Sequence, residues 1–525
     1  MGTGRKGGLA LAALAVSLLL PTAAQARDEV VTSFDGTPLV THFFPGKGSS
    51  ASSPAPTVMV GPGWSMAGET QSQGAVGIGG FFGTTAISVF IDNGYNVLTW
   101  DPRGFGGSGG TVQVDDPDFE GRDVSALIDY VSTQPEALLD GGGDPRLGMA
   151  GASYGGGIQL VAAGMDSRID AIAPTIAWNS LSTSLFQDDA LKLGWGTVLI
   201  AAGVEGATLP GLGSPAGPQA GNLDPLFYGT VTNGLLTGSP TDEQKAYFAD
   251  NGPDFLIPKI KAPTLLIQGT VDTLFPLDEG IRNFRGIDRN KQSPRHGKGV
   301  PVKMIFFCGG HGVCFTGNGP KGFVDARIVS WFDRYLLRDR GVDTGPKFQW
   351  VADDGVLRSS KRFPGKRVGA LRASGSGTLP LVPGPTGGGA LIFATPSPVA
   401  VNVEVPGPAK ASNVLGAPRV RLTYKGNAAP ANTFAYAQIV NPRTNQVLGN
   451  NTTPIPLQLD GSEHTISRKL EWVAGRVKAG QGYRLQLAPT SSVYDIQRSV
   501  GAVNFSSIDF NVPLRKPIRR DKVHR

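Results

Sequence analysis

The sequence predicts an α/β fold followed by an all-β domain, and three observations carry this prediction. Segments typical of strands and of helices alternate along the first half of the chain. A Gly-x-Ser-x-Gly pattern at 151–155 stands between one such strand and one such helix. Beyond residue 370, short segments rich in Val and Thr replace the helical patterns. Because 525 residues are too many for a single hydrophobic core, the change of pattern predicts two domains.

The first domain, over 27–360, is expected to contain a doubly wound, mainly parallel sheet with helices on both faces. In such a sheet the active site forms at the carboxyl ends of the strands. Strands are expected at 58–60, at 96–100, in a segment ending at 150, and at 169–176, 262–268 and 300–307. Helices are expected at 84–93, 124–132, 156–163 and 325–336.

Two other segments depart from this alternation. Residues 178–260 are rich in Gly, Ala, Leu and Thr, with helical pieces expected around 188–193 and 241–250, and predict a cap inserted over the strand ends. Residues 370–513 carry short alternating strands separated by turn residues at about every ten positions, which is typical of a β-sandwich.

Both ends of the chain differ from the body. Residues 1–26 contain two basic residues, an apolar run over 9–20 and the small-x-small sequence Ala24-Gln25-Ala26, which together predict a secretory signal peptide. The apolar run is shorter than the roughly 20 residues needed to span a bilayer. We therefore expect an exported protein without a membrane span, beginning near Arg27.

The net charge of +6 comes from these ends. The signal segment contributes +2 and the basic tail over 514–525 contributes +5, which leaves −1 for residues 27–513. A body without a basic field is not expected to bind nucleic acid. The tail has no apolar pattern and is expected to be disordered.

Ser153 is the candidate nucleophile. A sharp strand-to-helix turn needs small residues two positions before and after the serine, and Gly151 and Gly155 meet that requirement. A serine hydroxyl is a weak nucleophile at neutral pH, so it also needs a base and a group that orients the base.

The base can be sought by elimination among five histidines. His311 directly follows an expected core strand and is flanked by glycines. The other four lie before the main sheet, in a basic loop, in the β-sandwich and in the tail: His42, His296, His464 and His524. His311 is therefore the expected base.

The acid is expected at the tip of the preceding strand, where Asp272 follows 262–268. Asp278 is the alternative, but it opens a helix after Pro276 and reads more simply as an N-cap. The order nucleophile, acid, base is that of the α/β-hydrolase fold. For the oxyanion, the expected donors are the backbone N–H groups of Tyr154 and of Trp64, which follows the strand at 58–60.

Longer motifs carry a resemblance to a known family. Gly151-Ala-Ser153-Tyr-Gly-Gly156 and Asp101-Pro-Arg-Gly-Phe-Gly-Gly-Ser108, with the late Asp272 and His311 and the β-domain, resemble the Xaa-Pro dipeptidyl-peptidase and cocaine-esterase group. The resemblance implies a helical cap, a C-terminal jelly-roll domain and hydrolysis of acyl esters, amides or X-Pro bonds. Esterase members carry an oxyanion-loop Tyr that this chain lacks. A dipeptidyl-peptidase would need carboxylates for the substrate's amine, for which Asp188 and Asp189 are candidates, although two acids opening a helix are more often first-turn charges.

Cys308 and Cys314 are the only cysteines, and they bracket His311. Export into an oxidising space favours a disulfide between them over two buried thiols. No second ligand cluster accompanies the pair, so neither a metal site nor a cofactor is expected.

These observations predict a secreted serine hydrolase acting on a small-molecule or peptide acyl substrate. They leave peptidase and esterase activity open. A cell-wall or glycan-binding protein on a hydrolase scaffold is the rival from another class, and the complete set of Ser153, Asp272 and His311 argues against it.

Overall fold

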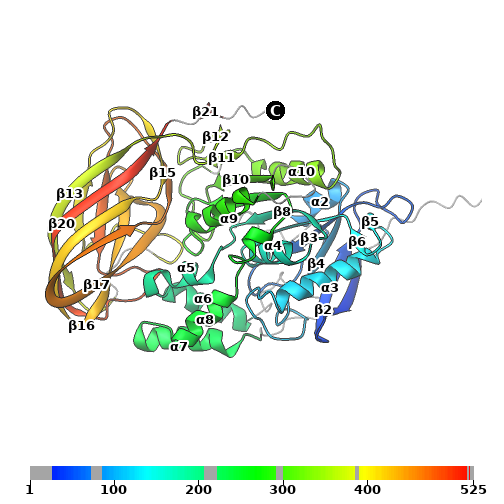
Figure 1. The fold of residues 1–525 in the computed structure, drawn as a ribbon, viewed down its shortest axis with the longest axis horizontal. Coiled ribbons are helices and arrows are strands. Elements are labelled where there is room, and N and C mark those ends of the chain that lie inside the picture. Colours follow the sequence, from blue (N-terminus) through cyan, green and yellow to red (C-terminus); the bar gives the residue numbers. More distant parts are fainter. Residues whose placement is uncertain are drawn as a thin grey trace, which may run out of the picture.

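The computed structural model describes residues 26–72, 85–205, 222–290, 299–317, 319–384, 390–516 and 519–520. Within these ranges the chain forms an α/β domain, with a large β-domain beside it (Figure 1). The predicted signal peptide lies outside the described residues except for Ala26, and so do His296 and His524. No helix of the described ranges is both long enough and apolar enough to cross a membrane.

The α/β domain is built on an 11-stranded sheet with the order β1-β2-β4-β3-β7-β8-β9-β10-β11-β12-β21. The neighbours from β4 to β11 pair in parallel, and the pairs at both edges are antiparallel. The strands are β1 Arg27–Thr32, β2 Pro38–Phe44, β3 Thr57–Gly61, β4 Asn96–Trp100, β7 Leu147–Ala152, β8 Ile169–Thr175, β9 Thr264–Gly269, β10 Val302–Phe307, β11 Phe348–Val351, β12 Leu357–Ser360 and β21 Arg519–Arg520. The predicted parallel sheet is confirmed.

Helices cover both faces of this sheet, and each face has its own hydrophobic core. Helices α3, α4 and α9 contribute Leu127, Leu160 and Ile281 to one core. Helices α2 and α10 contribute Phe90 and Trp331 to the other. The helices are α2 Ile87–Asp92, α3 Glu120–Ser132, α4 Tyr154–Met165, α9 Leu277–Arg289 and α10 Phe323–Tyr335. A small hairpin, β5 Leu139–Gly141 with β6 Asp144–Pro145, precedes β7.

The hairpin of β1 and β2 was not expected from the sequence. β1 is a charged edge strand whose residues are mostly exposed, whereas β2 is almost fully buried. Neither strand therefore shows the apolar-polar alternation that marks a half-buried strand.

Between β8 and β9 the chain forms the expected helical cap: α5 Leu181–Leu185, η1 Gln187–Asp189, α6 Leu193–Glu205, α7 Pro225–Thr237, α8 Asp242–Asp250 and η3 Ile257–Lys259. The helix expected at 241–250 is confirmed, with Thr241 as N-cap of a capping box. The helix expected around 188–193 is wrong. Asp188 and Asp189 have positive φ angles of 51° and 68°, which end η1 before α6 begins at Leu193.

The C-terminal domain is antiparallel throughout and encloses a core of its own. Its strands are β13 Arg367–Leu381, β14 Val401–Val405, β15 Ser412–Gly416, β16 Arg419–Asn441, β17 Gln446–Lys469, β18 Val473–Val477, β19 Tyr483–Ala488 and β20 Val500–Arg515. The predicted β-domain is confirmed, and it extends slightly beyond 370–513 at both ends.

The tail over 514–525 was predicted to be disordered, and this prediction is wrong for its first residues. Leu514 is only 7% exposed and belongs to the core of the β-domain. Arg515 pairs with both β13 and β15, and the chain then returns to the α/β domain, where β21 pairs with β12. Sequence composition alone misled here, because the buried contacts come from strands distant in the chain.

Deleting residues 514–525 is therefore expected to destabilise the protein. Burying a leucine side chain contributes about 1.5–3 kcal/mol, so the melting temperature should fall by about 5 °C. A chain ending at Lys516 keeps Leu514 and should melt close to the full-length protein. Calorimetry of the two truncations compares them, and equal melting temperatures would contradict the role of Leu514.

Candidate active site

Ser153 lies on the turn between β7 and α4, at the carboxyl end of a central strand. Its backbone has φ 58° and ψ −117°, a conformation that non-glycine residues rarely adopt. Strain of this kind persists only where the surroundings enforce it, and it concentrates at functional sites. A Cβ atom on Gly151 or Gly155 would lie 2.6 Å or 2.1 Å from the carbonyl oxygen of Gly61, so both positions require glycine.

The structure brings Ser153, His311 and Asp272 into one hydrogen-bonded chain. His311 Nε2 lies 2.9 Å from Ser153 Oγ, and His311 Nδ1 lies 3.0 Å and 2.9 Å from the two carboxylate oxygens of Asp272. Asp272 is fully buried and His311 is 5% exposed. This arrangement can pass the serine proton to the imidazole while the carboxylate holds the imidazole in place.

Asp272 is itself held by the turn that follows it. Its Oδ1 accepts hydrogen bonds from the N–H groups of Leu274 at 3.0 Å and Phe275 at 2.7 Å. The rival acid, Asp278, lies elsewhere: its carboxylate accepts from Lys469 Nζ at 2.6 Å and from the N–H of Trp472 at 2.7 Å. Its interpretation as an N-cap is also wrong, because Pro276 occupies that position. Asp278 instead ties α9 to the β-domain.

The other described histidines have partners away from Ser153. His42 is fully buried on β2, with Nδ1 2.8 Å from Asp28 and Nε2 3.7 Å from Asp101. Burial disfavours the charged imidazole there, but the two carboxylates outweigh it and raise the pKa of His42. His464 pairs with Asp460 in the β-domain.

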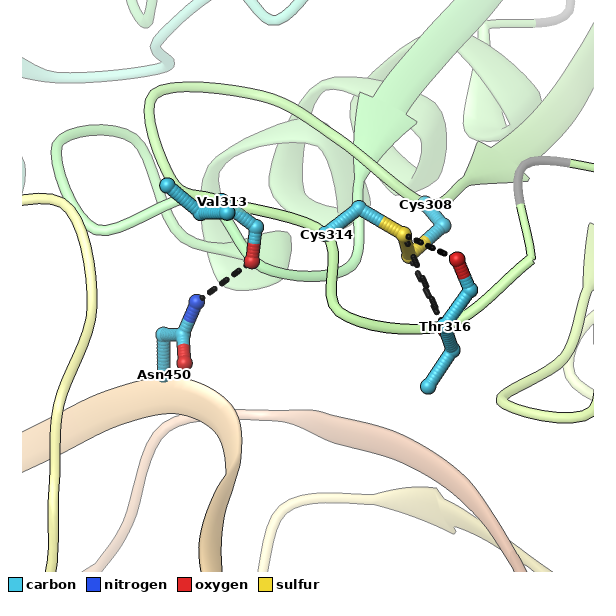
Figure 2. The surroundings of a disulfide bond; sticks show 5 residues. All are labelled: Cys308, Val313, Cys314, Thr316 and Asn450. Atoms are coloured by element: carbon cyan, nitrogen blue, oxygen red, sulfur yellow. Dashed lines mark hydrogen bonds between the residues drawn. A yellow bond between two sulfur atoms is a disulfide. The ribbon is translucent and has the colours of Figure 1, made fainter.

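The loop that carries His311 is closed by a disulfide between Cys308 and Cys314, whose Cα atoms are 5.5 Å apart. Figure 2 shows this bond and a contact from the β-domain, in which Asn450 Nδ2 donates to the carbonyl of Val313 at 3.0 Å. The N–H of Val313 donates in turn to the carbonyl of Ile392 at 2.8 Å. The β-domain therefore helps to hold the loop of His311.

Reducing the disulfide is expected to lower kcat several-fold and to leave the fold intact. A loop this short contributes only about 2 kcal/mol by chain entropy, and both domain cores lie elsewhere. We expect little change in far-ultraviolet circular dichroism or in KM. Thiol titration of the denatured, unreduced protein tests the premise, and two free thiols there would refute it.

Aromatic side chains surround the three residues. Trp195 of α6 and Phe275 stand edge-on to His311, with ring centroids 5.8 Å and 5.1 Å away. Trp64 lies 5.3 Å from the ring of Tyr154 and stacks on Phe227 of α7 at 5.2 Å. The cap thus supplies apolar walls to the site.

The two acids proposed to hold a substrate amine are engaged by cations. Asp189 is mostly exposed and lies 2.8 Å from Lys245 of α8. Asp188 lies 3.7 Å from Arg468 of the β-domain. Among the described residues, no group of three or more His, Cys, Asp or Glu side chains could hold a metal ion.

The two residues expected to supply the oxyanion donors are neighbours, because the rings of Trp64 and Tyr154 lie 5.3 Å apart. Tyr154 is the first residue of α4, where backbone N–H groups have no acceptor within the helix and favour negative charge. Trp64 follows β3, and its indole Nε1 donates to the carbonyl of Leu199 in α6 at 2.8 Å. The ring of Trp64 therefore links the loop after β3 to the cap.

Sequence reasoning missed a buried acidic group beneath Tyr154. The Tyr154 hydroxyl lies 3.4 Å from Glu120 Oε1 and 3.4 Å from the N–H of Asp115. Asp115 is fully buried, and neither carboxylate oxygen has a hydrogen-bond partner among the described residues. Burial raises the pKa of Asp115 well above its usual value and the pKa of Glu120 to about 8. Both line a small cavity with room for about one water molecule.

Because these two acids hold their protons more tightly when folded, stability is expected to depend on pH. Unfolded Asp and Glu lose their protons near pH 4, whereas the folded groups retain theirs to higher pH. The free energy of unfolding should therefore fall as pH rises from about 5 to about 8, by about 1.4 kcal/mol per unit for each proton.

Asp115→Asn should flatten this dependence, since an amide cannot lose the proton. Asp118→Asn is the matched control, because Asp118 is exposed in the same segment and should leave the slope unchanged. Denaturant unfolding across the pH range measures the slope. An unchanged slope in Asp115→Asn would show that Asp115 is ionised in the folded protein.

Comparison with known proteins shows what the chain is similar to. The chain is similar to an uncharacterised protein of Pseudomonas aeruginosa, 30% identical over 113 residues, which span 20% of this chain and 29% of that relative's length. Among solved structures, it resembles a CocE/NonD family hydrolase from Staphylococcus aureus, with 14% identity, a TM-score of 0.60 and 93% coverage of each chain.

Two further solved structures resemble both domains. One is an alpha-amino acid ester hydrolase, with 14% identity and a TM-score of 0.64 over 96% of this chain and 100% of that one. The other is an aminopeptidase from the marine sediment archaeon Thaumarchaeota archaeon, with 13% identity and a TM-score of 0.66 over 95% and 98%. At this identity the likeness shows a shared α/β-hydrolase fold. The model of the X-Pro dipeptidyl-peptidase (S15) family matches residues 35–312, more than half of the chain, and we conclude that the protein belongs to this family and is a serine hydrolase.

Proposed function

We propose that this protein hydrolyses peptide or ester acyl bonds through an acyl-enzyme on Ser153. The observation that carries the proposal is the continuous chain from Ser153 Oγ to His311 and on to Asp272. His311 accepts the serine proton as Oγ attacks the carbonyl carbon, and Asp272 orients the imidazole and stabilises its charged form.

The tetrahedral intermediate then places negative charge on the former carbonyl oxygen. The backbone N–H groups of Tyr154 and Trp64 are the proposed donors to this oxyanion. His311 next gives its proton to the leaving alcohol or amine, which departs and leaves the acyl group on Ser153. In the second half of the reaction, water activated by His311 attacks the acyl-enzyme and releases the carboxylic acid.

The surroundings of the site bear on the substrate. Its aromatic walls suit an apolar acyl or leaving group, because aromatic rings bury a large apolar area. A free substrate amine would need an available carboxylate, and Asp188 and Asp189 already pair with cations. This observation favours a second candidate, an acyl esterase without peptidase activity.

A fluorophosphonate probe tests the proposed nucleophile. We expect one equivalent to react, with Ser153 identified by peptide mapping. An enzyme that turned over substrate without labelling at Ser153 would contradict the proposal, and a protein inert to probe and substrates would favour the glycan-binding alternative.

A substrate screen separates the two hydrolase candidates. p-Nitrophenyl esters are compared with Ala-Pro and Gly-Pro anilides under the same conditions. Hydrolysis of both classes supports the peptide or ester hydrolase. Hydrolysis of esters alone supports the esterase.

We also propose that the protein is exported and that residues 1–26 are removed. Cleavage after Ala26 would leave β1 intact, since that strand begins at Arg27. The disulfide at the His311 loop suits an oxidising compartment. Sequencing the amino terminus of protein collected from the medium should find Arg27, and a protein that stays in the cell with Met1 attached would contradict export.

A further inference from the structure

A buried lysine of the cap contacts the turn that carries the proposed catalytic acid. Lys192, just before α6, is 2% exposed. Its Nζ donates to the carbonyl oxygens of Thr273 at 3.0 Å and Leu274 at 2.8 Å. Thr273 and Leu274 directly follow Asp272, so the cap binds this turn through two backbone carbonyl groups.

The same turn is held from several other directions. Asp272 Oδ1 accepts from two N–H groups of the turn, as described above. The Thr273 hydroxyl, which carries one donor proton, lies 3.1 Å from the carbonyl oxygen of His311 and 2.9 Å from that of Leu391. Trp195 Nε1 donates to that hydroxyl at 3.2 Å. Cap, His311 loop and β-domain therefore all meet at this turn, and Lys192 supplies its buried positive charge.

Lys192 is a buried cation without a direct ion pair: no carboxylate oxygen of the described residues is paired with its Nζ within 4.0 Å. The ring of Tyr494 lies 6.0 Å from Nζ. Three acids act on this charge from a distance. Glu471 lies between β17 and β18, Asp272 precedes the turn that Lys192 binds, and Glu279 lies in α9. A desolvated charge of this kind is costly and needs a compensating role or partner.

The neighbouring acids differ in their own partners. Glu279 Oε1 lies 2.5 Å from Arg282 Nη1, and Asp278 is paired with Lys469. Burial and the adjacent Asp278 raise the pKa of Glu471 well above its usual value. Burial lowers the pKa of Lys192 to about 8, which leaves the ammonium largely charged at pH 7. Of the acids that act on this charge, Asp272 is the one that belongs to the turn bound by Lys192, and its carboxylate hydrogen-bonds the imidazole of His311.

We propose that Lys192 is a positioning residue of the acid–base pair, which fixes the Asp272 turn through two carbonyls and places a positive charge beside the pair. This inference rests on the proposed function, because it assigns His311 as the base. Lys192 contacts neither Ser153 nor the imidazole, so it acts through Asp272. A positive charge beside the pair opposes protonation of His311, which lets the imidazole act as a base at lower pH.

Two variants separate the hydrogen bonds from the charge. Lys192→Met removes both, whereas Lys192→Gln removes the charge and keeps N–H donors. In both variants the apparent pKa on the acid limb of kcat/KM should rise by about one unit. Lys192→Met should also lose about ten-fold or more in kcat with KM little changed, because a loosened acid turn misplaces His311. Lys192→Gln should lose less kcat.

Lys303→Met is the matched control. Lys303 is a partly buried lysine of β10 that also donates to a hydroxyl and a carbonyl, those of Thr344 and Gly345. Burial lowers its pKa to about 8, as for Lys192. It stands at the start of β10, whereas the His311 loop follows the end of that strand. Lys303→Met should therefore change stability but not the acid limb.

The measurements are pH series of kcat and kcat/KM on the full-length protein, with melting temperatures for each variant. An acid limb unchanged in a folded Lys192→Met would overturn the proposal, as would an equal shift in Lys303→Met. If Lys192→Met does not fold, the acid limb of Lys192→Gln decides in the same way. Failure of the proposed function is a separate outcome, since it would appear in the wild type as the absence of fluorophosphonate labelling at Ser153.

Discussion

Replacing Ser153 with alanine is expected to lower kcat by about 10⁴-fold or more and to abolish labelling by fluorophosphonates. The reason is that nucleophile and base act as a unit, so that removing either one removes most of the catalysis that both provide. What remains should come from the oxyanion donors and from substrate binding. Steady-state kinetics and probe labelling measure the two effects.

The same substitution should leave the fold intact. Ser153 Oγ is part of a half-buried side chain and has His311 as its hydrogen-bond partner, so its loss creates almost no cavity. A melting temperature close to that of the wild type would show that the loss of activity is chemical. Labelling that persisted in a folded Ser153→Ala protein would mean that another serine is the nucleophile.

His311→Ala is expected to lower kcat about as much as Ser153→Ala, because no other described side chain hydrogen-bonds Ser153 Oγ in place of the imidazole. His464→Ala is the matched control. Both imidazoles hydrogen-bond an aspartate, His311 to Asp272 and His464 to Asp460 at 2.9 Å, but His464 lies in the β-domain. We expect His464→Ala to retain almost full activity.

His296→Ala should also be close to silent, although His296 lies outside the described residues. Strong damage from that substitution would show that the base was assigned to the wrong loop. In a double variant, Ser153→Ala with His311→Ala, the loss should be no greater than in either single variant, since the two groups serve one proton transfer.

Several features could be predicted from the sequence because they depend on neighbouring residues. The strand at 96–100 was predicted with the bounds of β4, since a run of apolar β-formers marks a buried strand. The turn around Ser153 is only five residues long, and it requires glycine at positions 151 and 155. His311 could be isolated because few histidines exist, and because just one follows a core strand between glycines.

Other features depend on contacts between distant segments, and only the tertiary structure decided them. Leu514 looks like part of a polar tail, yet strands about 100 residues earlier bury it. Asp278 looks like an N-cap, yet it binds Lys469 and Trp472 of the other domain.

Two ionisable residues near the site, Asp115 and Lys192, also depend on contacts that only the tertiary structure decided. From the sequence alone, no role was assigned to Asp115 or to Lys192. Burial raises the pKa of the first and lowers the pKa of the second, and both effects arise only when the surrounding elements exclude water. Local spacing therefore determined which residues do the proposed chemistry, whereas the fold determined the burial, the charges and the cross-domain contacts that hold them in place.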